Sequence, residues 1–514
     1  MSLLPLITRR LPVLVLSLAL GASSLGHGGE AEPAADGPLT VISASLLGGK
    51  GDEEVKAIAV LADGTVLAGG SCAGSFVVPG NKVTPSGTTK DSQGFLATFG
   101  PDGRLRSLGF TAQAIVALQV GPQDRIYMRD AASVITIMDP AKGKTLASFS
   151  VDKADQPKIA IDSDGRVLAI AGKQLVRFDA NGKKLWAVTP PAYGDNRPRA
   201  CAVDQKSGIA VVVGYGMTHT GHEPWKDPYA HGYDRSGKLL WTLWNNPPKD
   251  QADGKYGGTG LMADGTAHAV CATGDGRFMI TVVHDGGNAV TMRDPSDARK
   301  PIGQEVFSGS FQDGPGWGMK GAINTSVCFR VEAQKGTIEK GTWMCAWIEN
   351  HARANTLRME NCASDSKGTT YVVGASAAGL PLAKPWFSPR PDEYTGGGFL
   401  AVFDNKMALM QSGPWNPGDI NAVATNGGIV AIGGHAEGVG GKKEKKPIPP
   451  EEQMRLVKPV GQKAIDGDGD AVVVIFRRAG MPIKASEKND PIEAAGEKPD
   501  SEKPVPPTAQ ETGP

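Results

Sequence analysis

The chain has 514 residues, a hydrophobic fraction of 40% and no net formal charge at neutral pH. This composition is ample for a sizeable core, and the balanced charge argues against nucleic acid or an anionic membrane surface as a general electrostatic partner. The 68 glycines and 37 prolines exceed the usual shares, which favours many strands joined by tight turns.

The N-terminus has the features of an export signal. Arg9 and Arg10 precede an apolar run of about a dozen residues, and small residues follow at positions 21–24. The run is too short to anchor the chain in a bilayer, and no later stretch of sequence is long and apolar enough to span one. We therefore predict a secretory signal peptide over 1–26, a linker over 27–38, and an exported protein that is periplasmic, cell-surface or extracellular.

A short phrase recurs along the chain: an apolar strand, a turn with Asp or Gly, and a second apolar strand. Seven copies are found, at 56–70, 115–128, 158–172, 200–214, 269–283, 360–374 and 421–434. A second hairpin phrase follows most copies, with Asp before the turn and Gly in it. Two hairpins make one four-stranded blade, so we predict an all-β fold. It would be a seven-bladed β-propeller of antiparallel blades over 39–480, with six or eight blades as alternatives.

The two ends of the repeat region indicate how the ring closes. The last copy is followed by a third strand at 471–478 but by no fourth, and an extra strand stands before the first copy at 39–47. We expect this N-terminal strand to complete the last blade. Within that blade, residues 436–464 are charged and proline-rich, which predicts a flexible insertion, and 481–514 has the composition of a disordered tail.

One blade carries a more specific pattern. In residues 43–70, a GG-x-G-D segment precedes A-x-x-x-D-G and a valine-containing strand, with the match carried by Gly48, Gly49, Gly51, Asp52, Ala59, Asp63 and Gly64. This stretch resembles the exported bacterial seven-bladed propeller repeat known as SBBP, and residues 336–374 look like part of large exported propellers of the planctomycete type. The resemblance implies a cell-surface or extracellular setting and supplies no established reaction.

A second resemblance concerns the outer strands of two blades. The segments 178–186 and 233–241 look like the repeat of quinone-dependent enzymes and related assembly propellers, in which a terminal tryptophan docks neighbouring blades. Trp186 and Trp241 stand at that position here. The vicinal cysteine pair of the quinoproteins is absent from the sequence. We therefore interpret the two tryptophans as blade-packing residues and keep a quinoprotein-like oxidoreductase as an alternative.

Long insertions are predicted to gather on one face. They occupy 72–93, 215–228, 285–325, 377–396 and 435–469. All fall between the second and third strands of a blade, so all should emerge on the same side of the ring, which we call the looped face. The opposite side, the turn face, would carry the hairpin turns. Long loops on a rigid scaffold are the usual place for binding or catalysis.

The loop in blade 4 holds the best-marked candidate for a metal site. His219, His222 and His231 lie within thirteen residues, together with Glu223 and Asp227. Imidazole and carboxylate groups this close could hold a transition metal. The spacing is not the helical H-E-x-x-H pattern, and a solvated loop with surface histidines is the alternative. No other cofactor is expected.

Candidates for catalysis at the same face are His284, His351, Arg353 and Arg358. The arginines could grip a carboxylate or sulfate through two parallel hydrogen bonds. Alternatively, they could pair with neighbouring acids such as Glu349 or Glu360.

The cysteines read mainly as packing residues. Cys201, Cys271 and Cys362 precede the same alanine of the first-strand phrase in three blades, so we place them near the axis and too far apart for disulfides. Cys328 and Cys345 flank one hairpin, and a bond between them is left open.

These observations favour a monomeric binding or scaffold module whose looped face contacts an extracellular polymer, a surface component or a protein. The alternative is a metal- or histidine-assisted lyase or hydrolase, or the oxidoreductase above, with its site at the mouth of the central channel. An enzyme would need His222, His284, His351 and Arg358 to converge on one spot.

Overall fold

The computed structural model describes residues 37–73, 76–78, 81–83, 93–220, 223–246, 264–285, 290–307, 323–348, 353–388, 396–416, 418–437, 454–460, 462, 464–465 and 468–479. These residues all belong to one compact unit, which spans Ala35–Pro514. The predicted signal peptide, nearly all of the linker, most of the 436–464 insertion and the 481–514 tail lie outside the described residues.

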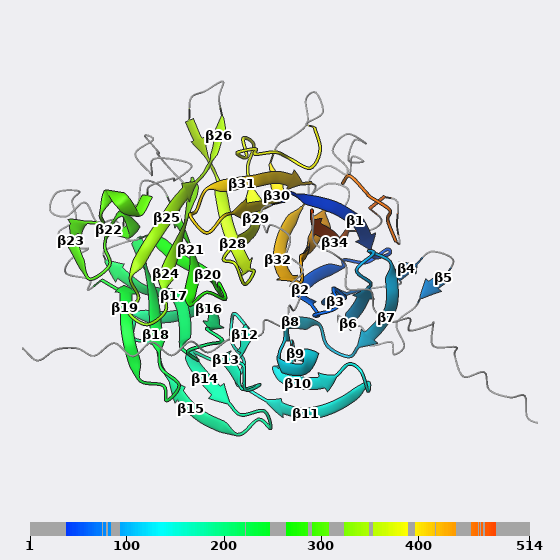
Figure 1. The fold of residues 1–514 in the computed structure, drawn as a ribbon, viewed down its shortest axis with the longest axis horizontal. Coiled ribbons are helices and arrows are strands. Elements are labelled where there is room, and N and C mark those ends of the chain that lie inside the picture. The colour runs from blue at the N-terminus through cyan, green and yellow to red at the C-terminus, as the bar shows by residue number, and fades with distance from the viewer. Residues whose placement is uncertain are drawn as a thin grey trace, which may run out of the picture. The chain divides into compact units, whose positions relative to one another are not determined.

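The prediction of a seven-bladed β-propeller is confirmed. Seven antiparallel four-stranded sheets follow one another around a ring, and the chain colours in Figure 1 run around it from blue to orange. Blade 1 contains β2 (Glu54–Val60), β3 (Val66–Cys72), β6 (Gln93–Phe99) and β7 (Leu105–Thr111). Blade 2 contains β8 (Ile115–Val120), β9 (Ile126–Asp130), β10 (Val134–Asp139) and β11 (Lys144–Ser150). Blade 3 contains β12 (Ile159–Ile161), β13 (Val167–Ala171), β14 (Gln174–Phe178) and β15 (Lys184–Val188).

Blades 4 to 7 continue the series. Blade 4 contains β16 (Asp195–Val203), β17 (Ala210–Thr220), β18 (Glu223–Tyr233) and β19 (Leu239–Trp244), and blade 5 contains β20 (Gly265–Ala272), β21 (Arg277–Asp285), β24 (Asn324–Glu332) and β25 (Ile338–Met344). Blade 6 contains β28 (Leu357–Ser364), β29 (Thr370–Ser376), β30 (Gly397–Phe403) and β31 (Leu409–Trp415). Blade 7 contains β32 (Asp419–Asn426), β33 (Ile429–Glu437), β34 (Gly469–Arg478) and β1 (Leu39–Leu47).

The N-terminal strand closes the ring as expected. β1 pairs antiparallel with β34 from Leu39 opposite Arg478 to Leu47 opposite Ala471, so blade 7 contains the first and the last strands of the fold (Figure 1). Closure by a strand from the other end of the chain joins the last blade to the first through backbone hydrogen bonds. It also covers an edge that β34 would otherwise expose.

The turn chemistry read from the sequence is also confirmed. At the β18–β19 turn, the Asp234 carboxylate accepts hydrogen bonds from the backbone N–H of Ser236 at 2.8 Å and of Lys238 at 2.9 Å. Gly237 follows with a φ of +88°, a left-handed conformation that residues with a side chain rarely adopt. The carboxylate and the glycine together fix this turn and the register of the strands that it joins.

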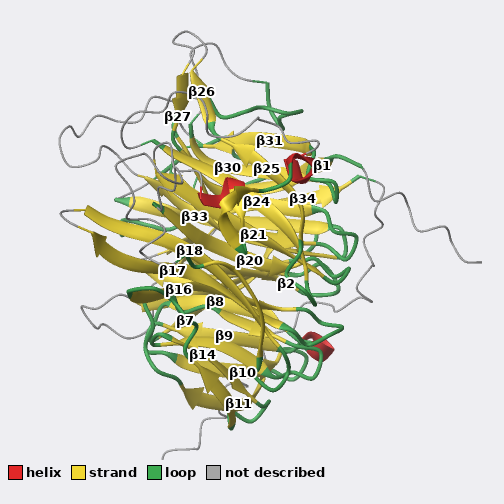
Figure 2. Ribbon diagram, turned by 90° about the vertical axis from the view of Figure 1, so that its left-hand side faces the viewer, coloured by secondary structure: helices red, strands yellow, loops and turns green. Residues whose placement is uncertain are grey.

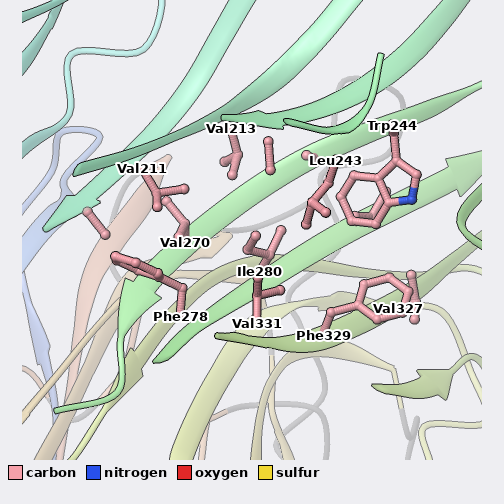
Figure 3. Packing of buried hydrophobic residues seen from close by; sticks show 14 of the residues in the cluster. Val211, Val213, Leu243, Trp244, Val270, Phe278, Ile280, Val327, Phe329 and Val331 are labelled. Carbon is pink, nitrogen blue, oxygen red and sulfur yellow. The ribbon is translucent and has the colours of Figure 1, made fainter. Parts of the chain in front are cut away.

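Apolar side chains fill the space between neighbouring blades. Each of seven clusters of buried residues joins two adjacent blades, so each sheet contributes both of its faces to packing. Figure 3 shows the largest of these layers, between blades 4 and 5, where Val213 and Leu243 face Ile280 and Phe329. This explains why the inner strands read as nearly continuous apolar runs rather than alternating ones.

The interpretation of the two tryptophans as blade-packing residues is confirmed. Trp186 of blade 3 donates through Nε1 to the Arg235 carbonyl of blade 4 at 3.0 Å, and Trp241 of blade 4 donates to the Ala333 carbonyl of blade 5 at 2.8 Å. In each case a glycine of the next blade lies against the indole ring, leaving no room for a side chain there. The tryptophan is therefore a latch from one outer strand to the next blade.

Four of the five predicted insertions do connect second and third strands without continuing them. The exception is 215–228, where β17 and β18 run on as one long hairpin to the pair Thr220 and Glu223. The prediction of a loop there was wrong, because the backbone pairing of the two strands continues through Gly214, Gly216, Pro224 and Pro228. Small hairpins occur within or beside the long connections: β4–β5 (Phe76–Val78, Asn81–Val83), β22–β23 (Arg293–Asp294, Asp297–Pro301) and β26–β27 (Ala346–Ile348, Arg353–Asn355).

Regular structure is otherwise almost entirely β (Figure 2). Three short 3-10 helices are present among the described residues: η1 (Pro122–Asp124), η2 (Val290–Met292) and η3 (Gln304–Phe307). In the part of the chain that the structure describes, no helix has the length and apolar character needed to cross a membrane.

Candidate functional site

A central channel runs along the inner strands of the ring. Its cavity of about 580 Å³ is lined by the first strand of every blade: β2, β8, β12, β16, β20, β28 and β32. Small side chains such as Ala57, Ala117, Ala200, Ala269 and Ala422 recur on its wall. These alanines are themselves buried in the clusters between blades, so they let the inner strands of neighbouring blades pack closely around the channel. The volume lies within the range of small-molecule sites, roughly 300–1,000 Å³.

A β-bulge interrupts the first strand at the same place in six blades. The pairing of the first strand with the second shifts by one residue, for example between Val55 and Ala57 in blade 1 and between Pro198 and Ala200 in blade 4. The extra residues are Lys56, Val116, Arg199, His268, Glu360 and Asn421. Blade 3 shows no such shift, but Lys158 directly precedes its first strand and lines the cavity. A β-bulge changes the direction of a side chain, and here it does so at the equivalent position of six blades.

These residues lie at the looped-face end of the channel. Antiparallel pairing sets the start of each first strand against the end of the second, as in the pair of Glu54 and Ser71. The long insertions begin where the second strands end. The bulge residues and the insertions therefore share one end of the propeller, and we call the polar ring formed by Lys56, Lys158, Arg199, His268, Glu360 and Asn421 the bulge ring.

Arg199 and His268 form the best-defined contact of the bulge ring. The guanidinium Nη2 lies 3.3 Å from His268 Nδ1. Burial, then Arg199 and Arg358, lower the pKa of His268 to about 3, so the imidazole is neutral at physiological pH. Because Nδ1 accepts from Arg199, the imidazole proton stays on Nε2, where it is a donor.

Lys158 contributes a second cation. Its side chain is half-buried and lines the channel. Burial and, next, the charge of Arg199 lower the pKa of the ammonium group. No hydrogen bond or ion pair of its Nζ is found among the described residues, and so a concentrated positive charge with three unused donors faces the cavity.

Glu360 is the carboxylate of the bulge ring. Burial and the nearby charge of Asp419 raise its pKa, whereas Arg358, Arg199 and Lys158 oppose that rise. It forms no ion pair in the described part of the structure. The Glu360 carboxylate therefore interacts electrostatically with Arg358, Arg199 and Lys158 without forming an ion pair with any of them.

Blades 6, 7 and 1 complete the ring by hydrogen bonds. Asn361 donates to the Asn421 carbonyl at 2.9 Å, and Asn421 donates from Nδ2 to Glu54 Oε1 at 2.7 Å. Glu54 in turn forms an ion pair with Lys56. This chain positions the side chains of three neighbouring blades, and it leaves Lys56 neutralised, unlike Lys158.

The turn-face end of the channel is different. It is lined by Gly121, Asp124, Gln205, Gly274 and Asn426, where the first strands end. Asp124 accepts a hydrogen bond from the Ala62 N–H at 3.1 Å, and Gln205 donates to the Ile161 carbonyl at 2.6 Å. Cations therefore gather at the looped-face end, whereas the turn-face end carries neutral groups and the carboxylates of Asp124 and Asp365.

The structure places His231 away from any open site. It lies in the middle of β18, is fully buried, and stacks on Tyr229 with ring centroids 4.7 Å apart. Its Nε2 lies 2.8 Å from the Pro191 carbonyl and its Nδ1 lies 3.0 Å from Thr242 Oγ1. Burial lowers its pKa to about 4. Both ring nitrogens are occupied by the fold, and neither is available to a metal in this arrangement.

His284 is likewise a residue of the core. It is fully buried at the end of β21, where Nε2 contacts Thr291 Oγ1 at 2.8 Å and the ring packs on Trp343. Burial lowers its pKa to about 3. His284 does not line the channel.

Arg358 lies at the looped-face end of the channel. It is exposed, it donates from Nε to Asn324 Oδ1 at 2.6 Å, and its charge acts on both His268 and Glu360. The structure thus brings one predicted candidate close to the bulge ring. His222 and His351 lie outside the described residues, as do the side chains of His219 and Arg353. Within the described part, no group of three or more His, Cys, Asp or Glu side chains could hold a metal ion.

Sequence reasoning gave no role to Lys158, Arg199 or His268, and it named Glu360 only as a possible partner of the arginines. A signal was present, because a polar residue stands just before the apolar first-strand phrase in several copies, as in Arg199-Ala200-Cys201. The copies at 200–214 and 269–283 were read from the residue after Arg199 and His268, whereas the copies at 158–172 and 360–374 begin with Lys158 and Glu360 but were read only for their apolar pattern. Charged residues are rarely buried beside an apolar inner strand, and here they are accommodated because they lie at the end of an open channel.

The six cysteines are thiols, including Cys328 and Cys345, whose bond was left open. The comparisons with known proteins add no relative: no family model matches the chain, and no curated protein matches it.

Proposed function

We propose that this protein is an exported binding propeller and that its ligand, an extracellular polymer or surface component, enters the channel from the looped face. One observation carries the proposal: the basic residues that line the channel, Lys56, Lys158 and His268, lie at the end where the insertions emerge. A scaffold of seven sheets with long insertions around its basic opening suits recognition rather than a purely structural role.

Export is supported by the sequence alone. Residues 1–26 have the charged start, apolar run and small-residue end of a signal peptide, and they lie outside the described residues. Expression of the full chain in a bacterium, followed by mass spectrometry of the fractionated product, tests this. Export predicts a mature N-terminus close to residue 27 outside the cytoplasm, and an uncleaved cytoplasmic product would contradict it.

Binding at the looped face can be tested without assuming the ligand's charge. The full chain is screened by affinity electrophoresis against neutral and acidic extracellular polysaccharides, and hydrogen–deuterium exchange is measured with a polymer that retards it. We expect protection in peptides that cover residues 264–268 and 354–360. Protection of the turns at 61–65 and 204–209 instead would place binding on the turn face, and retardation by no polymer would remove the polymer from the proposal.

A catalytic use of the same end of the channel is the second candidate. It is favoured by the opposite pKa shifts of Glu360, raised, and Lys158, lowered, beside one cavity. Such pairs are found at sites of proton transfer. Incubation with the retarding polymer would then produce new reducing ends or the ultraviolet absorbance of an unsaturated product. An unchanged polymer after prolonged incubation leaves binding as the function.

A further inference from the structure

We propose that the bulge ring binds an oxyanion group, through Lys158 on the channel wall, Arg199 beside His268, and Arg358 at the channel entrance. This inference rests on the proposed function and names the chemistry of its ligand. Carboxylate, sulfate and phosphate groups share that chemistry, because their oxygens accept hydrogen bonds from ammonium and guanidinium groups.

The first argument is that three cations lack an ion-pair partner. Within the described residues, Lys158, Arg199 and Arg358 enter no ion pair, and the two arginines donate only to neutral acceptors, His268 Nδ1 and Asn324 Oδ1. Lys56, by contrast, is paired with Glu54. Glu360 and Asp155 act on Arg199 through their charges, but neither forms an ion pair with it, so a ligand oxyanion could pair directly with these cations.

The second argument is the supply of unused donors. Arg199 Nε is buried and has no acceptor among the described residues. Lys158 lines the cavity, and no hydrogen bond of its ammonium group is found in that part of the chain. His268, neutral and protonated on Nε2, adds a donor without adding charge. A buried charged donor left unsatisfied costs free energy, and an oxyanion that accepts from it recovers that cost.

The third argument is access. Lys158 and His268 line a cavity whose wall carries alanines at Ala160, Ala200 and Ala269. The cavity of about 580 Å³ leaves space for a ligand beside Lys158 and His268. Because the bulge ring lies at the end of the channel where the insertions begin, an acidic side group of a polymer could enter from the looped face while the rest of the polymer stays outside.

The test uses small probes on the full-length chain. Glucuronate, sulfate, phosphate and, as the uncharged match of glucuronate, glucose are titrated calorimetrically at low and high salt. We expect at least one oxyanion to bind and glucose not to bind, with affinity falling as salt rises. The identity of the oxyanion that binds tells carboxylate, sulfate and phosphate ligands apart.

Variants locate the site. Lys158→Met and Arg199→Met keep the apolar stem and remove the charge, and each should weaken binding about tenfold or more. Arg197→Met is the matched control, since Arg197 lies two residues from Arg199 but is paired with Asp195, and it should change affinity little. Arg199→Lys, which keeps the charge, should retain part of the affinity, and circular dichroism shows which variants are folded.

Two results would overturn the inference: no oxyanion binding tighter than glucose, or equal binding by wild type and a folded Lys158→Met/Arg199→Met double variant. If a polymer still protects the looped face from exchange in either case, the proposed function stands and only the ligand chemistry is wrong. If no polymer binds either, both proposals fail.

Discussion

Cys271 and Cys362 meet at the interface between blades 5 and 6, where a hydrogen bond between their thiols raises the pKa of Cys271 well above its ordinary value. Cys362 also contacts the carbonyl of Met279, the residue that pairs with Cys271. Cys271 lies three residues after the bulge at His268, whereas Cys362 lies two after the bulge at Glu360. Since side chains alternate along a strand, the two thiols point toward each other's blade.

The sequence-based expectation that these cysteines are too far apart was therefore wrong. It assumed that each alanine after a cysteine marks the same position in its blade. In the structure, the Cys-Ala pair of blade 5 lies one residue further from the bulge than the Cys-Ala pair of blade 6. A shift of one residue along a strand moves a side chain to the other face of its sheet.

The buried thiols should react slowly in the folded protein. Burial raises the pKa of Cys72 and of Cys201 to about 12, and the thiolate is the reactive form. At pH 8, a chromogenic disulfide reagent should therefore modify the native protein slowly, because the thiolate fraction is lower by about a thousandfold than in an unperturbed thiol.

Denaturant provides the control for this measurement. All six thiols should react at once in the unfolded chain. Rapid modification of two or more thiols before unfolding would show that the interfaces between blades open readily, contrary to the packing described above.

Much of the fold could be predicted because it repeats. The same architecture is indicated independently by the seven copies of one hairpin phrase, by the Asp-Gly turns and by the unpaired strand at 39–47. The site could not be predicted in the same way. Nothing in the neighbouring sequence shows that Arg199 and His268 approach within 3.3 Å, because that distance depends on bulges in two blades. The histidine-rich segment at 219–231, in contrast, drew attention by composition, although His231 is a core residue.

Asp227 should make the protein less stable as the pH rises. It is buried, and Asn246 donates to it from its backbone N–H and its side chain. Burial raises its pKa to about 8, whereas in an unfolded chain the pKa is near 3.8. Between these values the folded state holds a proton that the unfolded state releases. Its contribution to the free energy of unfolding therefore falls with rising pH, by about a kcal/mol per pH unit.

Asp227→Asn should remove that dependence. The variant should be more stable than wild type at pH 8 and little changed at pH 4, as measured by urea unfolding at a series of pH values. Asp155→Asn, at an exposed position, serves as the control and should leave the pH profile unchanged. Equal profiles for wild type and Asp227→Asn would mean that Asp227 is not protonated in the folded state.

The buried pair of Arg177 and Asp162 should matter more than exposed pairs. Both side chains are almost fully buried, and Arg177 also donates to the Gly208 carbonyl of blade 4 at 3.2 Å. Arg177→Met leaves the Asp162 carboxylate without its cation and should lower the free energy of unfolding by roughly 3–5 kcal/mol. Addition of Asp162→Asn should restore a large part, because Asn still accepts the turn hydrogen bonds from Asp164 and Arg166.

Arg106→Met provides the comparison on the surface. Arg106 pairs with Asp102 at 3.3 Å, but more than half of its side chain is exposed. Loss of this ion pair should lower the free energy of unfolding, measured with urea, by about 1 kcal/mol or less. A similar cost for Arg106→Met and Arg177→Met would show that water reaches the inner pair.

Trp241 and Trp186 offer a matched test of the latch between blades, because they occupy the same place in consecutive outer strands. Phenylalanine keeps most of the ring and removes the N–H donor. Trp241 is 7% exposed and its bond to the Ala333 carbonyl is buried, so Trp241→Phe should lower the free energy of unfolding by about 1 kcal/mol or more. The bond of Trp186 to the Arg235 carbonyl is exposed, and water can replace it, so Trp186→Phe should cost less. Thermal unfolding of both variants decides this: a larger loss for Trp186→Phe would mean that the latch acts through ring contacts with the next blade and not through the hydrogen bond.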